Sequence, residues 1–326
     1  MSVSSGGIVE ATPGAEAAGP PPPEGEAAKI IEGRSPWRLA FERLRRDKAA
    51  MISLAVILVI LLVAIFASVF AGITGHGVNQ QFRDHPAGLT PQGLPVGPGR
   101  TFLLGTDDQG RDLLVRTAYG TRISLIVGVV ATLLTVALGA VLGLIAGYFG
   151  GFVDTVIARL VDVVLSVPFL LFAIALVSIS RPGLRIVIIT IAIFSWAAVC
   201  RVIRGHVLTL REKEYIEAAR SLGASSWRIM FIDMLPNVVA PIIVYATLLI
   251  PVSIVTEATL SFLGIGIPPP TADWGQMIAE SQGYYQHQWW FLVFPGLALL
   301  LTTLAFNIFG DGVRDALDPR SDRLFS

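Results

Sequence analysis

Long apolar runs alternate with shorter polar segments along the chain. Six of the runs hold few or no charged residues and are long enough to cross about 30 Å of hydrocarbon as helices. They comprise residues 49–73, 123–148, 160–178, 186–202, 238–256 and 291–309. This pattern predicts an all-α, polytopic membrane protein with six transmembrane helices.

The composition supports a membrane protein. Hydrophobic residues make up 53% of the chain and charged residues 15%, against about 25% charged residues in soluble domains. Mean hydropathy is +0.68. The formal net charge is +0, so no overall field favours nucleic acid. The single cysteine, Cys200, excludes an internal disulfide.

The polar segments divide the chain into five predicted parts. The first is a disordered Pro/Ala-rich cytoplasmic tail, and the second carries a basic surface helix and the first span. An amphipathic outer segment, the main transmembrane domain and a cytoplasmic C-terminal tail follow. Their boundaries are 1–33, 34–85, 100–122, 123–310 and 311–326.

Two local patterns within the spans predict contacts. Gly139, Gly143 and Gly147 recur every four residues, so they share one helix face and allow a second helix to approach closely. Arg159 and Asp162 stand three residues apart at the start of the third span, where they can form a structural pair.

The distribution of positive charge predicts the orientation. With an even number of spans both termini lie on one side, and that side carries 17 of the 24 Lys and Arg residues, against 7 on the other. Cytoplasmic segments carry the excess of Lys and Arg, so we expect both termini in the cytoplasm. Residues 206–237 lie on the same side.

Within that segment, residues 214–237 predict two short helices joined at a glycine. Gly223 suits the left-handed residue that follows a helix, and Ser225 or Ser226 can cap the next helix. Pro236 is expected to end the second helix, because proline lacks the N–H and clashes with the preceding turn.

This stretch resembles the EAA loop of membrane subunits of ABC importers. In that loop Glu-Ala-Ala is followed after three residues by Gly and later by Leu-Pro. The matching residues here are Glu217, Ala218, Ala219, Gly223, Leu235 and Pro236; Asp233 stands where the family usually has Ile.

Two further stretches resemble the dipeptide and oligopeptide permease group of that family. One is LGTDDQGRDLLVRTAYG before the second span. The other, LSFLGIG followed by PPP and WG, comes after the fifth span. The stretch before the second span can equally be a capped loop that lies on the membrane face or a segment that contacts a partner.

The resemblance implies a type I ABC importer permease fold and a peptide-translocating subunit in the cytoplasmic membrane of a prokaryote. It implies as partners a homologous second permease, two ABC ATPases and an extracytoplasmic solute-binding protein, besides membrane lipid. The EAA loop would couple to the ATPases, with Trp227 and Met230 as apolar anchors. Alternatively, the same residues only stabilise a cytoplasmic helical hairpin.

The substrate path is less defined. Glu257, Ser253 and Thr256 are polar residues late in the fifth span and so are candidates. Glu257 can meet a peptide amino group or can hold the outer loop. The same architecture can import glutathione, a nickel chelate or haem instead of peptides.

The sequence offers no sign of catalysis. None of the three lysines follows a glycine or precedes Ser or Thr, so a Walker A loop is absent. The four histidines show no metal-ligand spacing. We expect a non-enzyme without a metal or cofactor, with ATP and Mg²⁺ bound by the partner ATPases. The chain could also be a self-contained secondary transporter, which predicts inverted repeats, or a membrane-embedded enzyme or assembly scaffold.

Overall fold

The computed structural model of the protein describes residues 36–84 and 87–318. The predicted tail at 1–33 lies outside the described residues, as do residues 319–326 of the predicted C-terminal tail. The chain divides into two units, residues 1–35 and 36–326, and the description that follows concerns the second.

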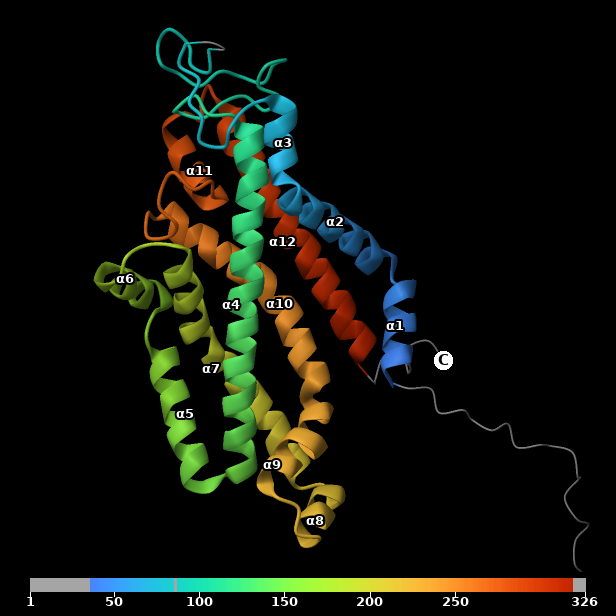
Figure 1. The fold of residues 1–326 in the computed structure, drawn as a ribbon. Helices are drawn as coiled ribbons and strands as arrows, with labels where there is room; N and C mark the ends of the chain where they lie inside the picture. The colour runs from blue at the N-terminus through green and yellow to red at the C-terminus, as the bar shows by residue number, and fades with distance from the viewer. Residues whose placement is uncertain (1–35, 85–86, 319–326) are drawn as a thin grey trace, which may run out of the picture. The chain divides into compact units, whose positions relative to one another are not determined.

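The described residues are helical and hold no strand beyond two isolated bridges. Shorter helices surround the long ones and form both ends of the bundle (Figure 1). The α-helices are α1 Pro36–Arg46, α2 Lys48–Ile65, α3 Ala67–Thr74, α4 Leu113–Phe149, α5 Gly151–Ser166, α6 Phe169–Ile179, α7 Leu184–Arg211, α8 Glu214–Ser221, α9 Ser226–Arg228, α10 Leu235–Phe262, α11 Trp274–Glu280 and α12 Trp289–Leu317. A π-helix, η1 Ile229–Met234, joins α9 to α10, and a 3₁₀ turn, η2 Ser281–Gly283, follows α11.

Five helices of the described chain are long and apolar enough to cross a membrane: α2, α4, α7, the stretch Ser226–Phe262 that ends with α10, and α12. The sixth predicted span, residues 160–178, is a pair of helices, α5 and α6, bent by 89° at a short break. The bend falls at Val167, which is extended, as the residue before a proline prefers to be. Pro168 therefore divides what hydropathy alone indicates as one helix.

The second span begins earlier than its predicted start at residue 123. Helix α4 starts at Leu113 and runs for 37 residues. The Asp112 side chain caps it by accepting from the backbone N–H groups of Leu114 and Val115. The second half of the predicted outer segment is thus helical and continuous with the span. At the far end of the chain, α12 likewise extends to Leu317, into the predicted C-terminal tail.

The first predicted span, residues 49–73, is divided into two helices, α2 and α3, by a break at Phe66. The break leaves carbonyl groups without helical partners, and Arg122 of α4 donates to two of them. Its Nε lies 3.0 Å from Ala64 O and its Nη2 lies 3.2 Å from Ile65 O. A charged residue of the second span thereby satisfies backbone groups of the first.

Helices α4 and α7 pack closely along the predicted glycine face (Figure 1). A Cβ added to Gly139 would lie 2.8 Å from Trp196 O, and one added to Gly143 would lie 2.7 Å from Cys200 O. A Cβ added to Gly147 would lie 2.7 Å from the Val207 side chain. The prediction of a close helix contact at these glycines is confirmed.

At the end of the bundle that carries α3 and α11, an ionic cluster joins a loop to two helices. Arg111 Nε contacts Asp107 Oδ2 at 2.5 Å, and Arg116 Nε contacts the same oxygen at 3.2 Å. Arg111 Nη2 also lies 3.3 Å from Glu280 Oε2 on α11. Burial, followed by the charge of a neighbouring aspartate, raises the pKa of Glu280 and the pKa of Asp108 above their usual values. The two guanidinium groups offset the carboxylate charge and fix the loop to the bundle.

Candidate functional site

The EAA segment, residues 214–237, turns sharply between its two helical parts at Gly223. This residue has φ +79°, in the left-handed region. Ala224 N–H donates to Ala219 O at 3.1 Å across the turn, a bond typical of a glycine-terminated helix. A Cβ added at Gly223 would meet no atom within 4 Å. The glycine is therefore needed for its backbone conformation and not for close packing within this chain.

The second helical part starts at Ser225, whose hydroxyl accepts from Arg228 N–H at 3.4 Å. The prediction that this part ends at Pro236 is wrong. The chain continues through the π-helix η1 into α10, and Pro236 stands in the first turn of α10. Leu235 N–H donates to Met230 O, five residues earlier. The wider π turn accommodates a residue that lacks an N–H, so the EAA segment runs without interruption into a membrane span.

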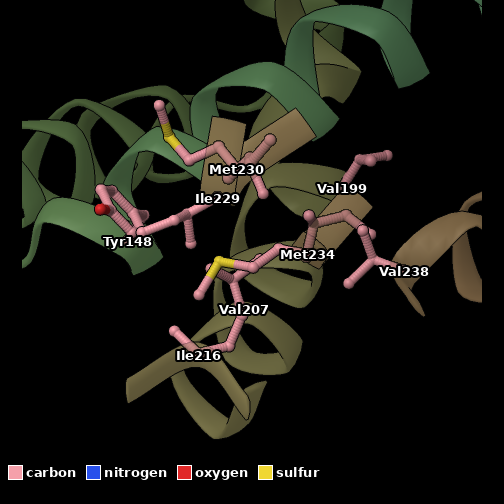
Figure 2. Close-up of a cluster of buried hydrophobic side chains, with 10 residues drawn as sticks. Tyr148, Val199, Val207, Ile216, Ile229, Met230, Met234 and Val238 are labelled. Carbon is pink, nitrogen blue, oxygen red and sulfur yellow. The ribbon is translucent and has the colours of Figure 1, made fainter. Parts of the chain in front are cut away.

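One face of the EAA segment is buried in its own molecule. Ile216 of α8 and Ile229, Met230 and Met234 of η1 have no exposed surface. They pack against side chains of α4, α7 and α10 (Figure 2). These partners include Tyr148, Val199, Val207 and Val238. The cluster fixes the segment to three long helices.

Met230 therefore does not present the exposed apolar surface that the sequence suggested for an anchor. Its side chain lies within the cluster just described. Trp227 is 64% exposed, and it stacks on Phe231 with ring centroids 5.4 Å apart. Trp227 and Phe231 stand four residues apart and form an exposed, stacked aromatic pair.

The same segment also contains a hollow. A hollow of about 470 Å³ lies between α8 and the second helical part. Leu222, at its edge, is 88% exposed, and Asp233 and Arg228 supply opposite charges to its wall. Its lining residues are Ala219, Leu222, Gly223, Ala224, Ser225, Arg228 and Asp233. A hollow with charged walls and an exposed leucine, in a segment that also exposes an aromatic pair, suits the docking of another protein.

The motif residues of α8 differ in exposure. Ala219 is half-buried beside the cluster, while Ala218 and Glu217 are exposed. Arg220 lies over the Tyr148 ring, 5.8 Å from its centroid, and so does not pair with Glu217. Within the part of the chain that the structure describes, Glu217 has no ion-pair partner. Its carboxylate faces outward beside the turn.

The predicted pair at the start of the third span lies on the surface. Arg159 Nη1 is 3.8 Å from Asp162 Oδ2. Arg201 of α7 approaches Asp162 more closely, with Nη2 3.0 Å from Oδ1. Asp162 thus links α5 to α7, and a second, more buried link is formed nearby by Arg204 and Asp154.

The three substrate-path candidates do not share an open surface. Glu257 has no exposed surface, and Ser253 is also buried, where its hydroxyl lies 3.1 Å from that of Thr132 on α4. Thr256 is half-buried, and its hydroxyl donates to Val252 O at 2.7 Å. Glu257 and Ser253 therefore face α4.

The amino-acid sequence matches two protein-family models. The model of the family described as "Binding-protein-dependent transport system inner membrane component" matches residues 139–323, which include the whole EAA segment. The chain belongs to this family. A second model, the N-terminal transmembrane domain of oligopeptide transport permease C, matches residues 35–91.

The curated relatives reported next match between 74% and 92% of this permease. The dipeptide transport system permease protein DppC of Alkalihalophilus pseudofirmus is 41% identical over 92% of this chain and 94% of its own. The di/tripeptide transport system permease protein DppC of Pseudomonas aeruginosa is 43% identical over 74% of this chain and 79% of its own. The glutathione transport system permease protein GsiD of Pectobacterium atrosepticum is 39% identical over 88% of this chain and 92% of its own.

A solved structure has the same fold. A chain of the MetNI methionine ABC transporter, in an inward-facing conformation, aligns with a TM-score of 0.51. The alignment covers 62% of this permease and 96% of that chain at 19% sequence identity. The permease is a multi-pass, all-α membrane protein with the type I ABC importer fold.

Sequence reasoning did not find several features of the site. The π-helix has no signal in composition, although Leu-Pro at its end is consistent with a widened turn. Phe231 was missed although it stands four residues after Trp227, a spacing that places both side chains on one helix face. Ser261 and Asp273, which contact each other beside Glu257, belong to the second family-like stretch, yet only their side-chain positions reveal the contact.

Proposed function

We propose that this permease is a non-catalytic subunit of an ATP-driven importer and that its EAA segment receives the mechanical input. The observation that carries the proposal is the two-sided character of this segment. One face is buried against α4, α7 and α10. The rest of the segment exposes Trp227 and Phe231, and it has a hollow lined in part by the exposed Leu222. A force applied to the exposed face is transmitted to the spans because the buried face holds the segment rigidly to them.

The partners in this proposal are two ABC ATPases, a homologous second permease and an extracytoplasmic solute-binding protein. ATP and Mg²⁺ are bound by the ATPases. The segment that docks them faces ATP, so the EAA segment and both termini lie in the cytoplasm, in agreement with the excess of Lys and Arg on that side.

The proposed substrate class is short peptides. Support comes from relatives of about 40% identity that are named as dipeptide and di/tripeptide permeases. A relative named for glutathione, itself a tripeptide derivative, is of similar identity, so glutathione is the second candidate. Uptake of a radiolabelled dipeptide and of glutathione by the reconstituted complex, each competed by the other, distinguishes the two.

A pull-down of the tagged chain in mild detergent, with mass spectrometry, tests the docking role. We expect ABC ATPases and a second permease to co-purify with the wild type, and Trp227→Ala to lose the ATPases. Trp289→Ala is the matched control, because Trp289 is 52% exposed at the other end of the bundle. Loss of ATPases in both variants, or in neither, would contradict docking at the EAA segment.

A further inference from the structure

A pair of carboxylates is enclosed where α10 ends and α11 begins. Glu257 on α10 and Asp273 at the N-cap of α11 have no exposed surface. Neither forms an ion pair with a cation of the described chain. Arg116, which reaches the same loop at Pro270 O (3.4 Å), makes its ion pair with Asp107. Two buried negative charges without a counter-ion are very unfavourable.

The Ser261 hydroxyl lies between the two carboxylates. Its Oγ is 3.0 Å from Glu257 Oε1 and 2.7 Å from Asp273 Oδ2, and it accepts from Ile267 N–H at 3.2 Å. A hydroxyl has one hydrogen and can donate to only one of these oxygens. The other contact is a hydrogen bond only if the carboxyl group supplies the hydrogen.

The remaining contacts decide which carboxyl group that is. Asp273 Oδ1 already accepts from Gln276 N–H at 3.2 Å, as helix caps do, and its Oδ2 makes the shorter contact to Ser261. Glu257 Oε2 accepts from Ser124 Oγ on α4 at 3.3 Å, which leaves Oε1 to carry a hydrogen. Among the described residues, Asp273 is the titratable group that faces Glu257, and α4 contributes the Ser124 hydroxyl there.

We propose that Glu257 and Asp273 hold a single proton, placed on Glu257, in the chain Glu257 O–H to Ser261 O–H to the Asp273 carboxylate. The buried proton fastens the outer loop, residues 263–273, and α11 to the end of α10. Backbone packing at the same place is tight, because a Cβ added at Gly266 or at Gly275 would collide with Ser261 or with Ala258. Glu257 is thus a positioning residue.

The consequence for transport rests on the proposed function. Helix α10 begins in the EAA segment and carries Glu257 in its last two turns, so one continuous helix joins the proposed ATPase contact to the outer loop. Movement of the EAA segment would reach the outer loop only while the proton-linked contact is intact.

Infrared difference spectroscopy of the full-length chain, purified with its co-purifying subunits in lipid nanodiscs, tests the proposal. We expect the wild-type minus Glu257→Gln spectrum to contain the carbonyl band of one protonated carboxylic acid, shifted in D₂O. Glutamine replaces the protonated acid closely, so this variant should unfold near the wild-type temperature. Glu257→Ala should lose the same band and unfold at a clearly lower temperature. Thr256→Ala, one residue away and outside the cluster, should keep the band.

Two results would overturn the proposal. Absence of the band from the difference spectrum would mean that Glu257 does not carry the proton. A thermal stability that depends on Na⁺ or K⁺ in the wild type, and no longer does in Glu257→Gln, would mean that a cation occupies the place of the proton. The infrared result does not depend on transport, whereas failure of the wild-type complex to take up any peptide would contradict only the proposed function.

Discussion

At the scale of single residues, Gly223 is defined by its backbone and not by its surroundings. It has φ +79°, and an added Cβ would meet nothing within 4 Å. Gly205, in helix α7, offers the same open space without a positive φ. The two glycines separate conformational strain from steric collision.

We expect Gly223→Ala to destabilise the protein by about 1–2 kcal/mol, since a side chain disfavours the left-handed conformation. Gly205→Ala should stabilise it by up to about 1 kcal/mol, because alanine is the better helix former. Thermal unfolding of the two purified variants measures both effects. Unfolding temperatures that shift in the same direction would show that the turn at Gly223 is not held as the structure has it.

At the scale of helices, the α4–α7 contact depends on backbone approach at three glycines. Gly143 is the most restricted by main-chain atoms, with Cys200 O 2.7 Å and Arg204 N 3.0 Å from the position of an added Cβ. Gly296 in α12 is the control for this contact, because nothing lies within 4 Å of a Cβ added there.

The expected outcome for Gly143→Ala is a loss of about 1–3 kcal/mol of stability, the usual cost of overpacking. Main-chain atoms of α7 cannot turn aside as a flexible side chain can, so the helices must separate. Gly296→Ala should leave the unfolding temperature unchanged or raise it slightly. The close contact would be refuted by an unfolding temperature of Gly143→Ala equal to that of the wild type.

The helices and their contacts show which features the sequence can predict and which it cannot. The glycine face of α4 and the Gly-turn in the EAA segment follow from local spacing and conformational preference, and both were predicted. The early start of α4 at Leu113 was not, because Arg116 and Arg122 interrupt the apolar run in its first turns. Nor was the burial of Met230, which depends on the π turn and on where α4 and α7 lie in space.

At the scale of the whole molecule, the bent pair α5 and α6 decides the topology. If the pair is one span, the described chain crosses the membrane six times, and both of its ends lie on one side. If the pair enters and leaves on the same side, there are five crossings and the ends are on opposite sides. Family membership and the excess of Lys and Arg favour six.

Accessible positions at both ends of the pair allow a direct measurement. Phe152, near the start of α5, is 83% exposed, Arg181 follows α6, and Leu222 in the EAA segment is 88% exposed. Single cysteines at these positions, in a Cys200→Ser background, are treated with a membrane-impermeant maleimide on intact cells.

We expect Arg181→Cys to react from outside and Phe152→Cys and Leu222→Cys to react only after permeabilisation. Two helices of 16 and 11 residues meeting at 89° do not form one straight rod, so this crossing relies on its neighbours for support. The Arg201 and Arg204 contacts from α7 to α5 provide that support on the side where Phe152 lies. Reaction of Phe152→Cys and Arg181→Cys from the same side would make the pair re-entrant, and the EAA segment and the N-terminal surface helix would then lie on opposite faces of the membrane.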